Sequence, residues 1–201
     1  MKNAERLPTI EKNNEGSSIQ TARMPITATA RIDNGYTYHG FCSFDLRLSN
    51  KAWVEAERYR FLEFVSSQST MHRISRFDLD TAYNSWVDNR IIQVVKEKVE
   101  RYNRLKANEP DVSLPEYQQE LKDAYLEILY NNPAGFELTA RMATNYRCIL
   151  NIINQRWNHR LPEWREVCRE FINELPLMED LVKVYAPSVD IEQLMGEEYH
   201  G

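Results

Sequence analysis

The side chains best suited to chemistry in this chain lie within residues 142–159. If this stretch is a helix, its apolar side chains form one broad arc, which is the kind of face that a globular protein buries. The members of that arc are Met142, Ile149, Leu150, Ile152 and Ile153. Asn145 and Arg156 fall inside the same arc, about three helical turns apart. Because an unpaired buried guanidinium costs several kcal/mol, Arg156 predicts a carboxylate, a phosphate or a polar ligand beside it.

Two interpretations of this pattern are open. In the first, Arg156 binds a ligand. In the second, it forms a structural ion pair with nearby Glu163 or Glu166. The opposite face of the predicted helix carries polar side chains at helical spacing, namely Arg147, Asn151, Asn154 and Asn158. That polar stripe is typical of ligand contacts and of a solvated surface alike.

A second concentration of hydrogen-bond donors lies in residues 66–77. Four serines, a threonine, His72, Arg73 and Arg76 fall within this stretch. Hydroxyl groups and bidentate guanidiniums are the donors that an oxyanion such as a phosphate prefers. The sequence therefore predicts a phosphate-binding loop here, with a polar surface loop as the alternative.

Size, composition and charge limit the classes of protein to consider. A chain of 201 residues that is 42% hydrophobic and 11% aromatic, with a mean hydropathy of -0.61, is typical of a folded, soluble protein. The net charge of -5 disfavours nucleic acid as a partner, despite Arg58, Arg60, Arg73 and Arg76. The sequence has neither a long apolar run nor a signal peptide, which predicts no membrane partner and a cytoplasmic location.

The cysteines indicate a reducing compartment and no structural metal. Cys42, Cys148 and Cys168 are three in number and widely spaced, so they do not form a disulfide framework. No two of them stand as Cys-x2-Cys, which disfavours a zinc site. The sequence therefore predicts reduced thiols and no metal ligand.

The elements that position the N-terminal candidates are predicted by alternation and turn signals. Residues 25–32 and 41–48 alternate apolar and polar side chains as strands do, with the turn signal Asp33-Asn34-Gly35 between them. A helix over residues 51–64 follows, capped by Ser49 or Asn50.

Helical periodicity dominates the rest of the chain. Helices are predicted over residues 83–105 and 116–130, separated by a segment rich in breakers. Pro162 ends the helix over residues 142–159, and another helix spans residues 163–175. Strands followed by long helices predict an α+β fold, a small antiparallel sheet carrying long helices.

Composition divides the chain into three regions. Residues 1–22 are polar and predict a flexible N-terminal arm. Residues 23–187 form a single catalytic-type domain in this interpretation. Residues 188–201 are acidic and predict a loose tail.

The pattern Asn145-x-Arg147-x3-Asn151-x4-Arg156, followed by His159, resembles the C-terminal signature helix of the flavin-dependent thymidylate synthases. The resemblance implies that family's fold, with FAD as cofactor and NADPH and methylenetetrahydrofolate as co-substrates. It also implies a homotetramer whose substrate is a pyrimidine deoxynucleotide. The implied reaction is one-carbon transfer to C5, which converts dUMP to dTMP or gives a hydroxymethylated dUMP or dCMP.

The resemblance also implies roles for single residues. Arg156 is the implied catalytic residue, because a guanidinium against the pyrimidine edge stabilises negative charge on the ring as C5 becomes nucleophilic. The implied cofactor contacts are Arg58, Arg60, His72, Asn145, Arg147, Asn151 and His159. The implied substrate contacts are Arg73, Ser75, Arg76, Arg141 and Arg156.

Two departures from the family's pattern motivate an alternative function. The family's Arg-His-Arg motif is followed, after seven intervening residues, by a serine. It corresponds to Arg58-Tyr59-Arg60 with Gln68 at the serine position, or to Met71-His72-Arg73, which has no serine there either. The family's flavin segment His-x-Thr-Pro-x-Glu-His has only a distant counterpart in residues 34–39. The alternative is a non-catalytic descendant of the same fold that binds a nucleotide or serves a structural role.

Overall fold

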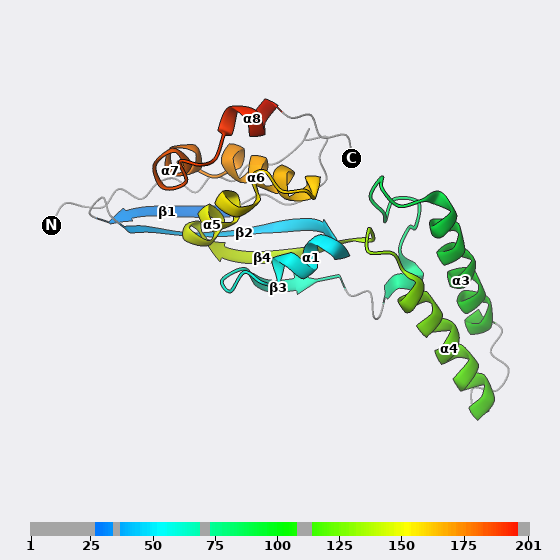
Figure 1. Ribbon diagram of the computed structural model, residues 1–201. Coiled ribbons are helices and arrows are strands. Elements are labelled where there is room, and N and C mark those ends of the chain that lie inside the picture. The colour runs from blue at the N-terminus through cyan, green and yellow to red at the C-terminus, as the bar shows by residue number, and fades with distance from the viewer. Residues whose placement is uncertain (1–26, 34–36, 69–72, 108–113, 197–201) are drawn as a thin grey trace. The chain divides into compact units, whose positions relative to one another are not determined.

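The structure is a computed structural model that describes residues 27–33, 37–68, 73–107 and 114–196 (Figure 1). Within these ranges, no helix combines the length and the apolar character needed to cross a membrane.

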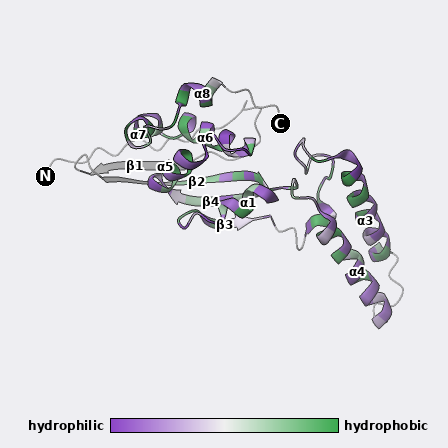
Figure 2. Ribbon diagram, in the orientation of Figure 1, coloured by the Kyte–Doolittle hydropathy of each residue, from purple (hydrophilic) through white to green (hydrophobic). Residues whose placement is uncertain are grey.

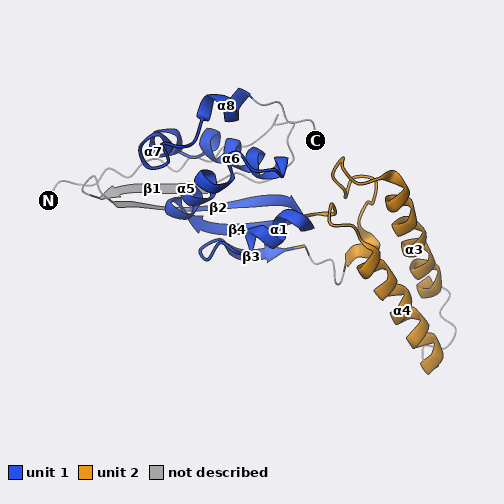
Figure 3. Ribbon diagram, viewed as in Figure 1, with its two compact units in different colours: residues 1–67, 139–201 blue, residues 68–138 orange. Residues whose placement is uncertain are grey.

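The described chain divides into two compact units (Figure 3). Unit 1 comprises residues 1–67 and 139–201, and unit 2 comprises residues 68–138. The single domain predicted over residues 23–187 thus consists of two units, because the middle of the chain has a hydrophobic core of its own.

Unit 1 is built on a four-stranded sheet with the order β1-β2-β4-β3. The strands are β1 (Thr27–Asp33), β2 (Thr37–Ser49), β3 (Glu63–Ser67) and β4 (Glu137–Asn145). β1 and β2 form an antiparallel pair in which Asp33 opposes Thr37, and part of the predicted turn between them lies outside the described residues. β3 and β4 are also antiparallel, and Ser67 opposes Ala140. Unit 2 is therefore inserted between two neighbouring strands.

The predicted alternation of β2 is confirmed. Cys42, Phe44, Leu46 and Leu48 are all buried, on the side where α5 (Tyr146–Arg156) packs against the strand. Strand residues two apart point to the same face, so one face of β2 forms the core. Phe44 contacts Phe171 edge to face, with ring centroids 5.0 Å apart.

The remaining helices of unit 1 are α1 (Asn50–Ala56), α6 (Pro162–Glu174), α7 (Met178–Tyr185) and α8 (Ile191–Gly196). Figure 1 shows α6, α7 and α8 in one layer on the sheet with α5. The helix α1 follows β2 directly, and its Glu55 contacts α5. α5 packs on β2, α6 and α7 pack on α5, and α8 packs on α6. The helix predicted over residues 163–175 is confirmed as α6.

Two predicted helices of unit 1 are shorter in the structure. The helix predicted over residues 51–64 ends at Ala56, because Glu63 and Phe64 pair with β4 as part of β3. The helix predicted over residues 142–159 begins only at Tyr146. Met142 is buried in β4, where Ala140 and Thr144 share its face. Strand pairing with distant residues overrides the local helical spacing in both places.

The acidic C-terminal stretch differs from the predicted loose tail over residues 191–196. These residues form α8, in which Leu194 is buried. The carbonyl oxygen of Leu194 accepts a hydrogen bond from the Arg169 guanidinium at 3.2 Å. One apolar anchor and one hydrogen bond thus attach this segment to α6.

Unit 2 is a helical hairpin with a short 3-10 turn, η1 (Ile74–Arg76). Its helices are α3 (Asn89–Ala107) and α4 (Pro115–Asn131), which confirms both helices predicted there, although α3 begins later than expected. Apolar and polar residues alternate along both helices (Figure 2). The buried core consists of Ile74, Leu79, Ala82, Val95, Val99, Ile128 and Phe136.

Candidate functional site

A cavity of about 690 Å³ lies in unit 1 between the turn after α1 and the N-terminal half of α5. Its lining residues are Arg58, Tyr59, Arg60, Phe61, Asn145, Arg147, Cys148 and Asn151. The first four follow α1, and the last four belong to the end of β4 and to α5. Two distant segments of the chain thus converge on one volume, and that volume is typical of small-molecule sites.

The cavity is lined by cations without anions. Arg58, Arg60 and Arg147 are exposed, and within the described ranges no carboxylate pairs with any of these three guanidiniums. No aspartate or glutamate is among the lining residues. Arginines of this kind are suited to bidentate recognition of phosphate or carboxylate. The cavity therefore favours an anionic ligand.

The two asparagines of the cavity have their oxygens engaged by the protein. Asn145 is the N-cap of α5, and its Oδ1 accepts from the backbone N–H of Cys148 at 2.9 Å. Asn151 Oδ1 accepts from the Gln155 amide at 3.0 Å. The Nδ2 groups of Asn145 and Asn151 remain as donors toward a ligand.

The thiol in the cavity wall is not an activated nucleophile. Cys148 is buried, and burial raises the pKa of its thiol, so the group is protonated at neutral pH. Cys42, Cys148 and Cys168 are all free thiols, and burial raises the pKa of Cys42 to about 12. Among the described residues no cluster of His, Cys, Asp or Glu could hold a metal ion. The cavity can thus bind and polarise a ligand but offers no thiolate or metal centre.

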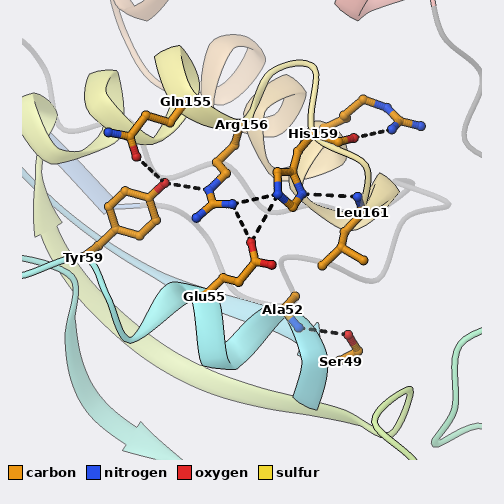
Figure 4. A network of polar contacts seen from close by, with 9 residues as sticks. Ser49, Ala52, Glu55, Tyr59, Gln155, Arg156, His159 and Leu161 are labelled. Atoms are coloured by element: carbon orange, nitrogen blue, oxygen red, sulfur yellow. Dashed lines mark hydrogen bonds and ion pairs between the residues drawn. The ribbon is translucent and has the colours of Figure 1, made fainter.

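Arg156 lies beside this cavity without being one of its lining residues. Its Nη1 donates to Glu55 Oε2 at 2.5 Å, and its Nε donates to the Tyr59 hydroxyl at 2.8 Å (Figure 4). The guanidinium carbon is 5.2 Å from the centre of the Trp164 ring. With its side chain only 14% exposed, the guanidinium is held by protein groups.

The carboxylate that meets Arg156 is therefore Glu55, and the predicted partners Glu163 and Glu166 are wrong. Glu163 accepts from the backbone N–H and the hydroxyl of Ser49, both at 2.8 Å. Glu166 pairs instead with Arg169, three residues later on α6. Glu55 could not be identified from the sequence, because it lies 101 residues before Arg156.

His159 completes the network around Arg156. The Leu161 N–H donates to Nδ1 of His159 at 3.2 Å, and Nε2 of the same ring lies 2.8 Å from Arg156 Nη1. That Nε2 is 3.3 Å from Glu55 Oε2, so His159 and Arg156 share one carboxylate. Burial lowers the pKa of His159, Glu55 partly opposes this shift, and Arg156 adds to it. His159 is thus neutral, and the structure places it in the Glu55 network, whereas the sequence predicted a cofactor contact.

The predicted substrate contacts are not brought together in unit 1. Arg141 lies on β4 and pairs with Asp45 of β2, with Nε 2.5 Å from Oδ1. Arg73, Ser75 and Arg76 belong to unit 2, whereas the cavity is formed entirely by unit 1. His72 lies outside the described residues. The prediction that these residues bind phosphate stays a prediction.

The predicted cofactor contacts agree better with the geometry. Arg58, Arg60, Asn145, Arg147 and Asn151 all line the cavity. Sequence reasoning missed Tyr59, Phe61 and Cys148 as lining residues. The position of Tyr59 between two candidate arginines was the available signal for it.

No protein-family model matches this chain, and no curated protein matches it. Its structure is similar to ThyX. Two solved structures of this flavin-dependent thymidylate synthase from Helicobacter pylori, both with FAD and dUMP, are 16% identical to the chain with a TM-score of 0.48. One match covers 75% of this chain and 73% of the ThyX chain, and the other covers 79% and 74%.

Proposed function

We propose that the cavity of unit 1 binds FAD in an enzyme that transfers one carbon to C5 of a pyrimidine deoxynucleotide. One observation supports this most. The five residues Arg58, Arg60, Asn145, Arg147 and Asn151, to which the signature resemblance gives cofactor contacts, converge on a single cavity from two distant segments. The spacing of residues within each segment does not by itself bring residues 58–60 next to residues 145–151, whereas contact with one cofactor requires it.

The chemistry of the cavity fits such a cofactor. FAD carries two phosphates and a planar ring system with polar edges. The unpaired Arg58, Arg60 and Arg147 suit the phosphates, and the amide donors of Asn145 and Asn151 suit ring oxygens. When bound, the flavin supplies the redox chemistry, with NADPH and methylenetetrahydrofolate as co-substrates in this proposal. The protein binds and orients these groups.

The substrate in this proposal is dUMP or dCMP, and the product carries a methyl or a hydroxymethyl group at C5. This reaction needs no nucleophilic side chain, because the flavin and the folate supply the reactive atoms. That fits a cavity in which the only thiol among the lining residues is protonated. A homotetramer, as in the family that the signature resembles, is part of the same proposal.

An absorbance spectrum of the purified protein and a flavin titration test the cofactor. We expect bound flavin, and we expect Arg58→Ala, Arg60→Ala and Arg147→Ala each to raise the Kd for FAD at least about tenfold, because each removes a charge-assisted contact. Arg104→Ala is the matched control, since that exposed arginine of unit 2 pairs with Glu100 on the same helix. Absence of flavin binding, or equal losses in the control, would contradict the proposal.

Release of tritium from C5-labelled dUMP or dCMP tests the reaction, in the presence of methylenetetrahydrofolate and NADPH. Release from one nucleotide and not the other identifies the substrate. Without tritium release from either, the C5 chemistry is excluded.

A second candidate is a non-catalytic nucleotide-binding descendant of the same fold. The observation that favours it is the engagement of Arg156 by Glu55 and Tyr59, away from the lining of the cavity. This candidate predicts binding of a flavin or nucleotide without tritium release.

A further inference from the structure

Tyr59 joins the Arg156 network to the cavity. Tyr59 is one of the lining residues, and its hydroxyl accepts a hydrogen bond from Arg156 Nε at 2.8 Å. The same hydroxyl donates to Gln155 Oε1 at 3.1 Å. Burial raises the pKa of Tyr59, so the hydroxyl keeps the proton that this second bond needs. Figure 4 shows the Tyr59 hydroxyl between Gln155 and Arg156, so Arg156 is one hydrogen bond away from a lining residue of the cavity.

A second wall residue is attached to the same chain of hydrogen bonds. The Gln155 amide, which accepts from Tyr59, also donates to Asn151 Oδ1 at 3.0 Å. The order of hydrogen bonds is therefore Arg156, Tyr59, Gln155 and Asn151. Each bond fixes the donor and acceptor roles of the next group, so the orientation of the Asn151 amide depends on the guanidinium.

At the other end of this series of hydrogen bonds, Arg156 is held in place by Glu55. Glu55 accepts from Arg156, and their side chains are 19% and 14% exposed. His159 shares the same carboxylate oxygen at 3.3 Å. A guanidinium presents its donors in a rigid planar fork, which sets the directions of Glu55 and Tyr59 relative to each other. A lysine ammonium would pair with Glu55 but has no such fork.

We propose that Arg156 is a positioning residue for the cavity. It fixes Tyr59, and through Gln155 the amide of Asn151, in the orientation that receives the ligand, and it does not itself contact that ligand. This role differs from the direct grip on a pyrimidine that the signature resemblance implies. That the ligand is FAD rests on the proposed function.

Hydrogen exchange in the ligand-free protein tests whether the wall is positioned in this way. The Tyr59 N–H donates to Ala56 O at 3.0 Å, and the Leu62 N–H donates to Tyr59 O at 3.1 Å, so these two amides report on the turn that carries the wall. We expect exchange at both to be about tenfold faster in Tyr59→Phe and in Arg156→Lys. Unchanged exchange in both variants would overturn the proposal.

Arg169→Met is the matched control for loss of a buried ion pair. Arg169 is 8% exposed and pairs with Glu166, but it lies on α6 and does not line the cavity. This variant should lower the melting temperature without changing exchange at Tyr59 and Leu62. If Arg169→Met accelerates exchange at these two amides as much as Arg156→Lys does, the faster exchange reflects a general loss of stability. The proposal that Arg156 positions the wall is then rejected.

A double-mutant cycle on FAD affinity separates positioning from direct contact. If Arg156 acts through Tyr59, Tyr59→Phe and Arg156→Lys each raise the Kd about tenfold, and the double variant binds no more weakly than either single variant. Additive losses, about 100-fold in the double variant, would indicate a direct contact by Arg156 and overturn the proposal. Should the wild type bind no flavin, the proposed function fails, while the exchange measurement still decides whether Arg156 positions the wall.

Discussion

Arg156 shows how a charged side chain is accommodated on an otherwise apolar helix. Its α5 neighbours Ile149, Ile152 and Ile153 are buried, and the guanidinium itself is largely buried. Burying a guanidinium is unfavourable unless its charge and its donors are satisfied. Glu55 supplies the charge and Tyr59 the second acceptor. The energetic requirement was predictable from the sequence, whereas the partners were not.

Removing the guanidinium should lower the stability of the protein, because the Glu55 carboxylate loses its partner. We expect Arg156→Met to lower the free energy of unfolding by about 3 kcal/mol, because Glu55 becomes an uncompensated, largely buried charge. The double variant with Glu55→Gln should recover much of this loss. Urea unfolding of both variants measures the difference. Equal stabilities of the single variant and the wild type would show that the pair is solvated.

A single residue, Glu170, should also make the stability of the protein depend on pH. Burial raises the pKa of this carboxyl to about 7, and Glu166 and Glu174 on the same helix add to the shift. Its folded-state pKa is above the unfolded value, so its contribution to stability is present below about pH 4.3 and is lost as pH rises through about 7.

We therefore expect Glu170→Gln to be more stable than the wild type at pH 8, where the wild-type carboxylate is ionised in both states. The advantage should shrink as pH falls from about 7 toward 4.3. Urea unfolding at several pH values measures this trend. If the difference in stability between the two proteins does not vary with pH, folding does not shift the pKa of Glu170.

At the scale of elements, the junction between β2 and α1 depends on Ser49. Its hydroxyl accepts from the Ala52 N–H at 3.2 Å and so caps α1. The same hydroxyl donates to Glu163 Oε1 at 2.8 Å, which joins α1 to the first turn of α6. Because α1 leads into the turn that carries Arg58 and Tyr59, this cap lies one element away from the cavity.

Ser49→Ala should lower the free energy of unfolding by about 1–2 kcal/mol, through the lost cap and the loss of one partner for buried Glu163. Thermal unfolding of the variant measures the cost. Ser85→Ala, on the exposed surface of unit 2, is the control. If both variants melt alike, the cap has no role in holding α1.

At the scale of the whole molecule, unit 2 is an insertion into the β3–β4 pair. Ser67 and Ala140 are opposite each other in antiparallel strands, and the intervening residues form a unit with its own core. Every residue that lines the cavity belongs to unit 1. Formation of the cavity should therefore not require unit 2.

Replacing residues 68–139 by Asn-Gly tests this independence. The two residues form a tight turn suited to a direct hairpin between β3 and β4. We expect the shortened chain to unfold cooperatively and to retain the FAD affinity of the full chain, if the full chain binds FAD. Loss of cooperative unfolding would show that unit 1 depends on the inserted unit.

The sequence by itself determined the elements whose signal is local. The alternation in β2 and the helical periods of α4 and α6 reflect one buried face each, and a buried face is visible in the spacing of apolar residues. The asparagine and arginine spacing of residues 145–151 likewise identified side chains that lie in one cavity.

Only the tertiary structure decided where β4 gives way to α5, which carboxylate holds Arg156, and that Tyr59 lines the cavity. Each of these depends on contacts between residues far apart in the chain. Strand pairing with β3 keeps Met142 extended despite helical spacing, and Glu55 meets Arg156 across 101 residues. Local periodicity carries no information about such partners, because they are set by how the elements pack.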